Sequence, residues 1–175
     1  CGVQRYTFPK AEASVFLNLK KAMNWDFTLD SRIEVVDSMT IRGYRFSQGW
    51  SPLQHVYFET RFSKPFVACH MDTTSIVTKD RGWIGTAYIA RFDFNTEKDE
   101  EILVTTGISG VSMEGAGKNL RAEAPKDDFD YYQMQAAKTW NKQLSKIEVK
   151  SSDTDDLVKF YTALYHSMIA PTVYS

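Results

Sequence analysis

At residues 40–62 the chain reads TIRGYRFSQGWSPLQHVYFETRF, and this stretch decides the fold class. Apolar and polar residues alternate through Thr40–Phe46 and again through His55–Phe62, which is the two-residue period of a half-buried β-strand. The typical turn residues Gly49 and Ser51-Pro52 lie between the two runs. The stretch therefore predicts two strands joined by a short loop.

Six further runs of the same kind lie on either side of this pair. Turn-forming clusters such as Asp37-Ser38, Ser63-Lys64-Pro65 and Asp80-Arg81-Gly82 separate them. The runs are Val3–Phe8, Ser14–Leu19, Arg32–Val36, Phe66–His70, Ala87–Phe94 and Glu101–Ile108. Several short strands at this spacing favour an antiparallel sandwich, so we predict a mainly β fold as far as about residue 112.

After Ser112 the apolar period lengthens from two residues to that of a helix. Ser112 is a suitable N-cap for a short helix that ends before Pro125. A longer helix begins at Asp127-Asp128, whose charges suit the positive end of a helix dipole. Its apolar face would consist of Phe129, Tyr132, Ala136, Trp140 and Leu144.

The last part of the chain predicts one more helix. Lys146–Val149 alternates briefly like a strand, and Ser151–Asp156 then offers an N-cap. Pro171 would stop the helix. Its apolar stripe is formed by Leu157, Phe160, Tyr161, Leu164 and Met168.

Composition and charge narrow the possible functions. The 175 residues are 43% hydrophobic, which is enough for a sizeable core. A formal net charge of −1 provides no basic field for phosphate backbones, so nucleic acid is not an expected partner. No run of about 20 apolar residues predicts a membrane span. The nine tyrosines and four tryptophans suit sugar-binding clefts and protein interfaces alike.

Metal binding and nucleophilic catalysis find little support in the sequence. His55, His70 and His166 are far apart and form no HExxH or HxH spacing, so we assign no metal ligand. Cys1 and Cys69 lie in no CxxC pattern; a buried free thiol is favoured, and a single disulfide stays open. The carboxylates occur in charged runs typical of turns and helix caps, so no residue is assigned a catalytic role.

The stretch Gly43–Trp50 is the best candidate for a binding site. A strand runs here into a loop that carries aromatic, guanidinium, hydroxyl and amide groups, and sugar sites are built from such groups. The candidate substrate-binding residues are Arg45, Phe46, Ser47, Gln48 and Trp50. The alternative is that Tyr44 and Phe46 alternate into the core, Trp50 covers a sheet edge, and the polar residues are solvated.

Several blocks, taken together and in order, resemble glycoside hydrolase family 92. The resemblance spans nearly the whole chain, and its last block is the most specific part. The blocks are Gln4-Arg5-Tyr6-Thr7-Phe8-Pro9, Gly43-Tyr44-Arg45, Trp50, Val56-Tyr57-Phe58, Phe62-Ser63-Lys64-Pro65-Phe66, Gly107-Ile108-Ser109, Val111-Ser112-Met113-Glu114-Gly115-Ala116, Asn119-Leu120, Trp140-Asn141 with Leu144, Phe160-Tyr161-Thr162-Ala163-Leu164-Tyr165-His166, Ala170-Pro171 and Ser175.

The resemblance implies an exo-acting α-mannosidase that requires Ca²⁺ and inverts the anomeric carbon. Its substrates would be terminal α-mannosides of mannose-containing glycans, with α-1,2 linkages the expected target. The enzyme would be exported by a bacterium to the periplasm or the exterior. The catalytic carboxylates and the calcium ligands of the family would lie mainly beyond Ser175, so the chain alone is expected to be inactive.

The resemblance also implies a domain plan. Residues 1–124 would be part of an N-terminal β-sandwich of the galactose-mutarotase-like supersandwich type, 125–150 a helical linker, and 151–175 the first helix of an α/α catalytic barrel. On this plan the chain is an internal fragment, so we expect a second copy or the missing portions of the enzyme as partners. The competing hypothesis is a self-contained carbohydrate-binding or adhesion sandwich.

Overall fold

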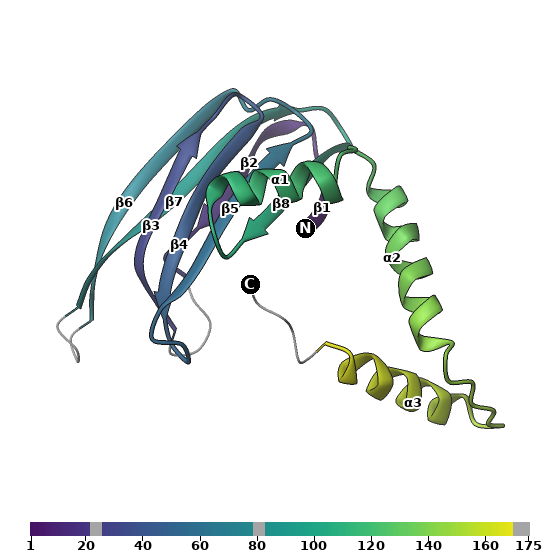
Figure 1. The fold of residues 1–175 in the computed structure, drawn as a ribbon. Coiled ribbons are helices and arrows are strands. Elements are labelled where there is room, and N and C mark those ends of the chain that lie inside the picture. The colour runs from purple at the N-terminus through teal and green to yellow at the C-terminus, as the bar shows by residue number, and fades with distance from the viewer. Residues whose placement is uncertain (22–25, 79–82, 170–175) are drawn as a thin grey trace. The chain divides into compact units, whose positions relative to one another are not determined.

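The computed structural model describes residues 1–21, 26–78 and 83–169, and these form eight strands and three helices (Figure 1). The chain divides into two compact units, Cys1–Asp127 and Asp128–Ser175. The strands are β1 (Gly2–Phe8), β2 (Ala11–Asn18), β3 (Phe27–Val35), β4 (Thr40–Gln48), β5 (Gln54–Phe62), β6 (Ala68–Thr78), β7 (Trp83–Thr96) and β8 (Glu100–Ser109). The helices are α1 (Met113–Glu123), α2 (Phe129–Leu144) and α3 (Thr154–Ser167).

The first unit is an antiparallel β-sandwich. Its larger sheet has the strand order β1-β8-β5-β4-β3, and its smaller sheet has the order β2-β7-β6. Every pairing is antiparallel. The predicted mainly β sandwich is confirmed, and each of the eight predicted runs overlaps one of the strands. The poorest agreement is at Phe66–His70, because β6 begins only at Ala68.

The core lies between the two sheets and is rich in aromatic side chains. Phe62 from the larger sheet packs on Phe92 and Phe94 from the smaller one, with ring centroids 5.4 and 5.5 Å apart. All three are at most 1% exposed. Because an aromatic side chain buries up to about 250 Å², this group holds the two sheets together. The core also includes Leu19, Ile33, Ile41, Phe58, Ala90, Ile102 and Val104.

Helix α1 lies across the outer face of the larger sheet, where Figure 1 shows it in front of β5 and β8. Ser112 is its N-cap, as predicted, and the Ser112 hydroxyl accepts a hydrogen bond of 3.0 Å from the Gly115 amide. The approach to the sheet is close because Gly107 has no side chain; a Cβ there would lie 2.8 Å from the Leu120 amide nitrogen. Arg121 and Glu59 add an ion pair of 3.0 Å between helix and sheet.

The second unit contains two capped helices. Asp128 and Asp153 accept hydrogen bonds from the Tyr131 and Asp155 amides. The first helix therefore begins at the predicted Asp127-Asp128, and the second has its N-cap within the predicted range Ser151–Asp156. The Trp140 and Tyr165 rings meet at a centroid distance of 4.6 Å. Among the described residues, no side chain of α2 or α3 is buried.

One detail of the sequence prediction is wrong, and another falls on residues outside those that the structure describes. Lys146–Val149 is not a strand; it forms an irregular connection in which the Tyr161 hydroxyl donates to the Ile147 carbonyl at 3.1 Å. Its short alternation has no neighbouring strand with which to pair. Helix α3 ends at Ser167, and Pro171 lies outside the described residues.

Candidate functional site

Strand β4 distributes the candidate residues over two faces. Arg45 and Ser47 point into the sandwich, because they share the face of Ile41, a core residue. Phe46 and Gln48 lie on the outer face, the one that α1 partly covers. Trp50 follows in the β4–β5 loop and is 91% exposed. The five residues therefore meet at one end of the sandwich without sharing a single surface.

Arg45 has a defined set of partners inside this end of the sandwich. Its Nε donates to the Leu19 carbonyl at 3.1 Å and to the Thr28 hydroxyl at 3.0 Å. The Thr28 hydroxyl itself donates to the Leu19 carbonyl at 2.7 Å. Asp26 lies 3.6 Å from Arg45 Nη1, at the distance of a weak ion pair. These contacts hold the guanidinium in one position, which is what a binding group requires.

Four buried polar atoms at this end have no hydrogen-bond partner in the structure. They are Asp26 Oδ1, Arg45 Nη2, Ser47 Oγ and Gln48 Oε1; the fifth such atom among the described residues is Thr105 Oγ1. An unsatisfied buried polar atom costs about 1–3 kcal/mol. The four atoms do not face one common space, because Arg45 and Ser47 point into the sandwich whereas Gln48 lies on the outer face. Arg45 Nη2 is a donor, and Asp26 Oδ1 and Gln48 Oε1 are acceptors, so each of them matches a hydroxyl group.

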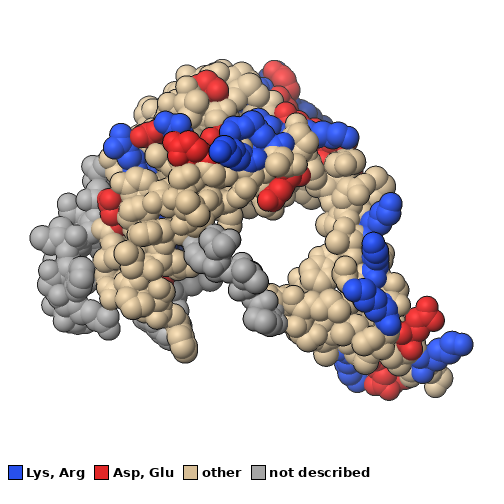
Figure 2. Space-filling model, in the orientation of Figure 1, with Lys and Arg blue, Asp and Glu red and all other residues tan. Residues whose placement is uncertain are grey.

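The outer face beside this group carries a cluster of four rings. Phe46 stacks on Tyr44 with centroids 4.4 Å apart and lies 4.2 Å from the His55 ring, and Tyr57 completes the cluster at 5.6 Å from Phe46. Figure 2 shows charged side chains gathered over α1, whereas the surface between α1 and the β4–β5 loop is mostly uncharged. The face therefore combines aromatic area with little charge, as sugar-binding surfaces do.

Tyr44 has the one clearly shifted pKa in this region among the groups that the structure describes. Burial raises the pKa of the Tyr44 phenol, and its hydrogen bond of 3.0 Å to Asp30 raises it further. The phenol is therefore a donor, fixed on Asp30, throughout the neutral range. The alternative prediction, in which Tyr44 and Phe46 pack in the core, is wrong. Both residues lie on the outer face of the larger sheet, opposite the core.

The loop after β4 is held close to the buried group. The Gly49 amide donates to the Ser51 carbonyl at 3.1 Å, and the Ser51 hydroxyl donates to the Leu53 carbonyl at 2.9 Å. A Cβ at Gly49 would lie 3.1 Å from Asp26 Cβ, so the loop and Asp26 are near neighbours. Trp50 does not cover a sheet edge, because its side chain is almost fully exposed.

Sequence reasoning missed three members of this end of the sandwich: Asp26, His55 and Tyr57. The signal for the two rings lies in the strand register, where Tyr44 pairs with Tyr57 and Phe46 with His55. Asp26 is recognisable only from its distance to Arg45. The two cysteines are free, and Cys69 packs partly buried against the core.

Two family models match the chain in succession. The model of the glycosyl hydrolase family 92 N-terminal domain matches residues 1–109, and that of the family 92 catalytic domain matches residues 115–175. The chain belongs to glycosyl hydrolase family 92. The first match covers the sandwich strands, and the second takes in α2, α3 and all but the start of α1.

Solved structures of the family share the fold. A family GH92 α-mannosidase from Bacteroides thetaiotaomicron matches 99% of this chain with a TM-score of 0.84 and 26% identity. The same enzyme in complex with mannoimidazole matches 94% with a TM-score of 0.79. An inverting GH92 mannosidase from the same organism matches 94% with a TM-score of 0.78 at 20% identity.

The matched family 92 enzymes are much longer than this chain. The chain spans 24% and 22% of the two GH92 α-mannosidase structures. No curated protein sequence matches it. Within the described residues, no helix is long and apolar enough to cross a membrane.

Proposed function

We propose that this chain is part of an α-mannosidase that hydrolyses terminal α-mannosides of glycans. The observation that carries the proposal is the match of 99% of the chain to a GH92 α-mannosidase at 26% identity. Because the chain spans about a quarter of that enzyme, the activity would belong to the whole protein. The complex of that enzyme with mannoimidazole supports a mannose-containing glycan as the ligand.

The chain's own contribution to this function would be to bind and orient the sugar at the β4 end of the sandwich. Arg45 Nη2 would donate to a sugar hydroxyl, while Ser47 Oγ and Gln48 Oε1 would accept from others. Phe46 and Trp50 would offer ring faces to the C–H side of a pyranose. Binding of this kind positions the scissile bond relative to the reacting groups and so lowers the entropic part of the barrier.

General acid and base catalysis would come from carboxylates outside this chain. An inverting glycosidase needs two carboxyl groups about 6.5–9.5 Å apart with a water between them. The carboxylates nearest the proposed binding groups have other partners, since Asp26 faces Arg45 and Asp30 accepts from Tyr44. We therefore expect the 175-residue chain by itself to release no mannose.

Calcium dependence, inversion, α-1,2 specificity and export to the periplasm or exterior are further parts of the proposal. Among residues 1–21, 26–78 and 83–169, no group of three or more His, Cys, Asp or Glu side chains could hold a metal. Ca²⁺ prefers six to eight oxygen ligands.

The test uses the full-length protein and α-1,2-, α-1,3- and α-1,6-linked mannobiosides. Release of mannose from one of them, lost with a chelator and restored by added Ca²⁺, is the expected result. The anomer first released, followed by NMR, reports inversion or retention. Failure to release mannose from all three substrates in the presence of Ca²⁺ would refute the proposed activity and favour a carbohydrate-binding sandwich.

A further inference from the structure

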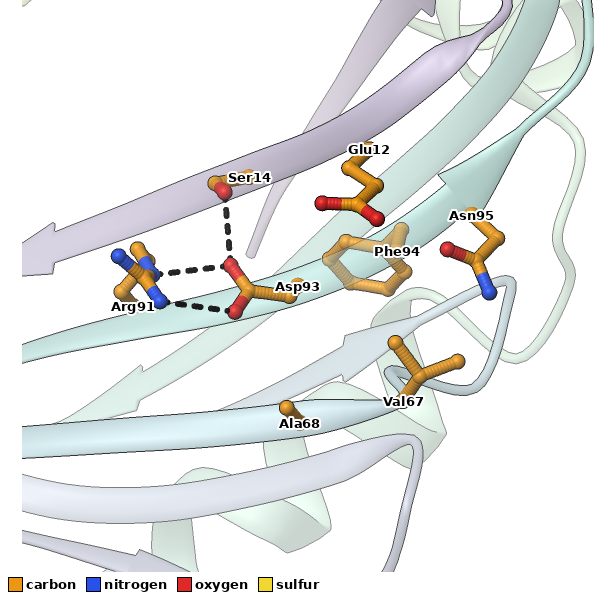
Figure 3. Close-up of a pocket in the computed structure, with 8 residues that line it drawn as sticks. All are labelled: Glu12, Ser14, Val67, Ala68, Arg91, Asp93, Phe94 and Asn95. Atoms are coloured by element: carbon orange, nitrogen blue, oxygen red, sulfur yellow. Dashed lines mark hydrogen bonds and ion pairs between the residues drawn. The ribbon is translucent and has the colours of Figure 1, made fainter.

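A second polar pocket lies on the outer face of the smaller sheet, away from β4. Its volume is about 360 Å³, which falls in the ~300–1,000 Å³ range typical of small-molecule sites. Strand β2 contributes Glu12 and Ser14, and β7 contributes Arg91, Asp93 and Asn95 (Figure 3). The side chains project from neighbouring strands at paired positions, since Glu12 is opposite Asn95 and Ser14 is opposite Asp93.

Asp93 lies at the centre of this pocket and contacts side chains from three strands. Its Oδ1 accepts a hydrogen bond from the Ser14 hydroxyl at 2.7 Å and lies 3.0 Å from Arg91 Nε in an ion pair. Its Oδ2 accepts from Arg91 Nη2 at 3.1 Å and lies 3.2 Å from His70 Nε2. Asp93 therefore has contacts with three side chains, those of Ser14, Arg91 and His70. We infer that it acts as a positioning group.

The carboxylate of Asp93 also fixes Arg91 with its remaining donors available. A guanidinium has five N–H donors, and the two contacts with Asp93 use only two of them. The Ser14 bond, which is the largest influence, and the Arg91 contacts lower the pKa of Asp93, so this arrangement persists to acidic pH. The charges of Arg91 and Asp93 cancel at neutral pH, so the remaining formal charge among the pocket-lining side chains is that of Glu12.

Glu12 and the Asn95 amide group supply acceptors and a further donor. Among the described residues, neither side chain makes a hydrogen bond or ion pair, and Figure 3 shows both beside the same space as Asp93. One strand position past Ser14 on this face lies Phe16, whose ring is 66% exposed and which pairs with Arg91. The face thus combines planar donors, planar acceptors and an aromatic surface, which is the set that a pyranose ring requires.

We propose that this pocket is a second, non-catalytic binding site for a neutral sugar residue of a glycan. Glu12 and Asn95 would accept from and donate to vicinal hydroxyls, Arg91 would donate from the other side, and Phe16 would pack on the C–H face. The site lies on the sheet opposite the one that carries β4, so its occupant and the sugar at β4 would be distinct residues. Such a site would hold the enzyme on a branched or polymeric substrate and raise its effective concentration.

The test measures binding to the 175-residue chain, to which the proposed function assigns no activity. The chain, labelled with ¹⁵N, is titrated with the methyl α-glycosides of mannose, glucose and galactose, and amide shifts are mapped onto the sequence. We expect weak binding, with a Kd of roughly 1–10 mM for a single sugar, and shifts centred on residues 12–16 and 91–95. Affinity gel electrophoresis in yeast mannan provides a second, multivalent measurement.

The variants Glu12→Ala, Asn95→Ala and Phe16→Ala should each weaken binding at least fivefold. Asp72→Ala is the matched control, because Asp72 is an exposed acid farther along the same face of the smaller sheet and does not line the pocket. If a variant fails to fold, the shift map of the unaltered chain decides. Binding of any of the three sugars at the pocket supports the proposal.

Two results would overturn the pocket proposal. The first is the absence of shifts at residues 12–16 and 91–95 with all three sugars together with unretarded migration in mannan. The second is an affinity that the three variants leave unchanged. Shifts confined to Ser47 and its neighbours would refute this pocket and leave the proposed function standing, whereas failure on mannobiosides would refute the function and leave the pocket.

Discussion

Replacing Ser47 by Ala separates two roles that a buried hydroxyl can have. Ser47 is 1% exposed, and its Oγ makes no hydrogen bond in the described structure. An unsatisfied buried polar group costs about 1–3 kcal/mol. Deleting the oxygen removes this cost and leaves a cavity of a single atom, so the free energy of unfolding should stay constant or rise by up to about 1–2 kcal/mol.

The kinetic effect should have the opposite sign if the hydroxyl binds substrate. A hydrogen bond between neutral groups contributes about 0.5–1.5 kcal/mol, and about 1.4 kcal/mol corresponds to a factor of ten. In the full-length enzyme, Ser47→Ala should therefore lower kcat/KM on the preferred mannobioside roughly twofold to tenfold. A more stable yet slower enzyme is the outcome expected if the hydroxyl contacts the substrate, and a control variant must separate it from a general trade-off between stability and activity.

Thr105→Val is the matched control for this experiment. Thr105 is also 1% exposed with an unpartnered hydroxyl, but it lies on β8, away from the β4 end. The Thr105→Val variant should gain stability to a similar extent, measured by urea unfolding, and the full-length enzyme that carries it should keep its kcat/KM. If Ser47→Ala and Thr105→Val have the same kcat/KM, Ser47 does not contact the substrate. If Ser47→Ala is less stable than the unaltered protein, the hydroxyl has a hydrogen-bond partner, such as a buried water. That result would contradict the claim that the Ser47 hydroxyl is unsatisfied in the folded protein.

Three further predictions test other parts of the structure. Trp50→Ala should change the free energy of unfolding by less than about 0.5 kcal/mol because the side chain is 91% exposed. The same substitution should lower kcat/KM of the full-length enzyme. An unchanged kcat/KM would show that Trp50 does not contact the substrate. Gly107→Ala should destabilise the protein in urea by about 1–3 kcal/mol, because its Cβ would lie 2.5 Å from the Ala116 carbonyl oxygen, whereas Gly2→Ala, with nothing within 4 Å, should have little effect. The pKa of Tyr44 is raised in the folded state, so its contribution to the free energy of unfolding is complete below the unfolded-state pKa of 10.0 and is lost as the pH rises through the folded-state pKa. Tyr44→Phe should therefore make the free energy of unfolding less dependent on pH in the alkaline range. Identical pH profiles for the variant and the unaltered protein would contradict the burial of the phenol.

The strands were predictable because a strand pattern is local. Runs such as Thr40–Phe46 and His55–Phe62 alternate within themselves, and each lies on one strand of the structure. The inward face was harder to predict, because both faces of β4 carry apolar groups. Ile41 faces the core, while Tyr44 and Phe46 join a ring cluster on the other side. A single strand does not reveal which of two apolar faces meets the second sheet.

The candidate site was predictable in part, for the same physical reason. The stretch Arg45–Trp50 identified groups that lie close together because they follow one another in the chain. Asp26 joins them only through the pairing of β3 with β4, which brings Thr28 opposite Ser47. The pocket at Asp93 depends even more on register, since Ser14 and Asp93 are 79 positions apart. Contacts of this kind come from strand pairing, which the local sequence pattern does not contain.

The end of the sandwich unit does not coincide with the start of the catalytic-domain match. That match begins at residue 115, inside α1, yet α1 packs on the larger sheet and belongs to the sandwich unit. Arg61 extends this attachment, since its Nη2 donates to the Ala124 carbonyl at 3.0 Å and to Asp127 Oδ1 at 2.9 Å.

The next residue, Asp128, is the N-cap of α2 and begins the second unit. The change from one unit to the other therefore falls between two adjacent aspartates with different partners, one held by the sandwich and one by a helix. The sandwich thus fixes the backbone at the point from which the helical part of the chain starts. A family 92 enzyme built in this way has the first helix of its catalytic-domain sequence anchored to the sheet that also carries the candidate sugar-binding strand β4.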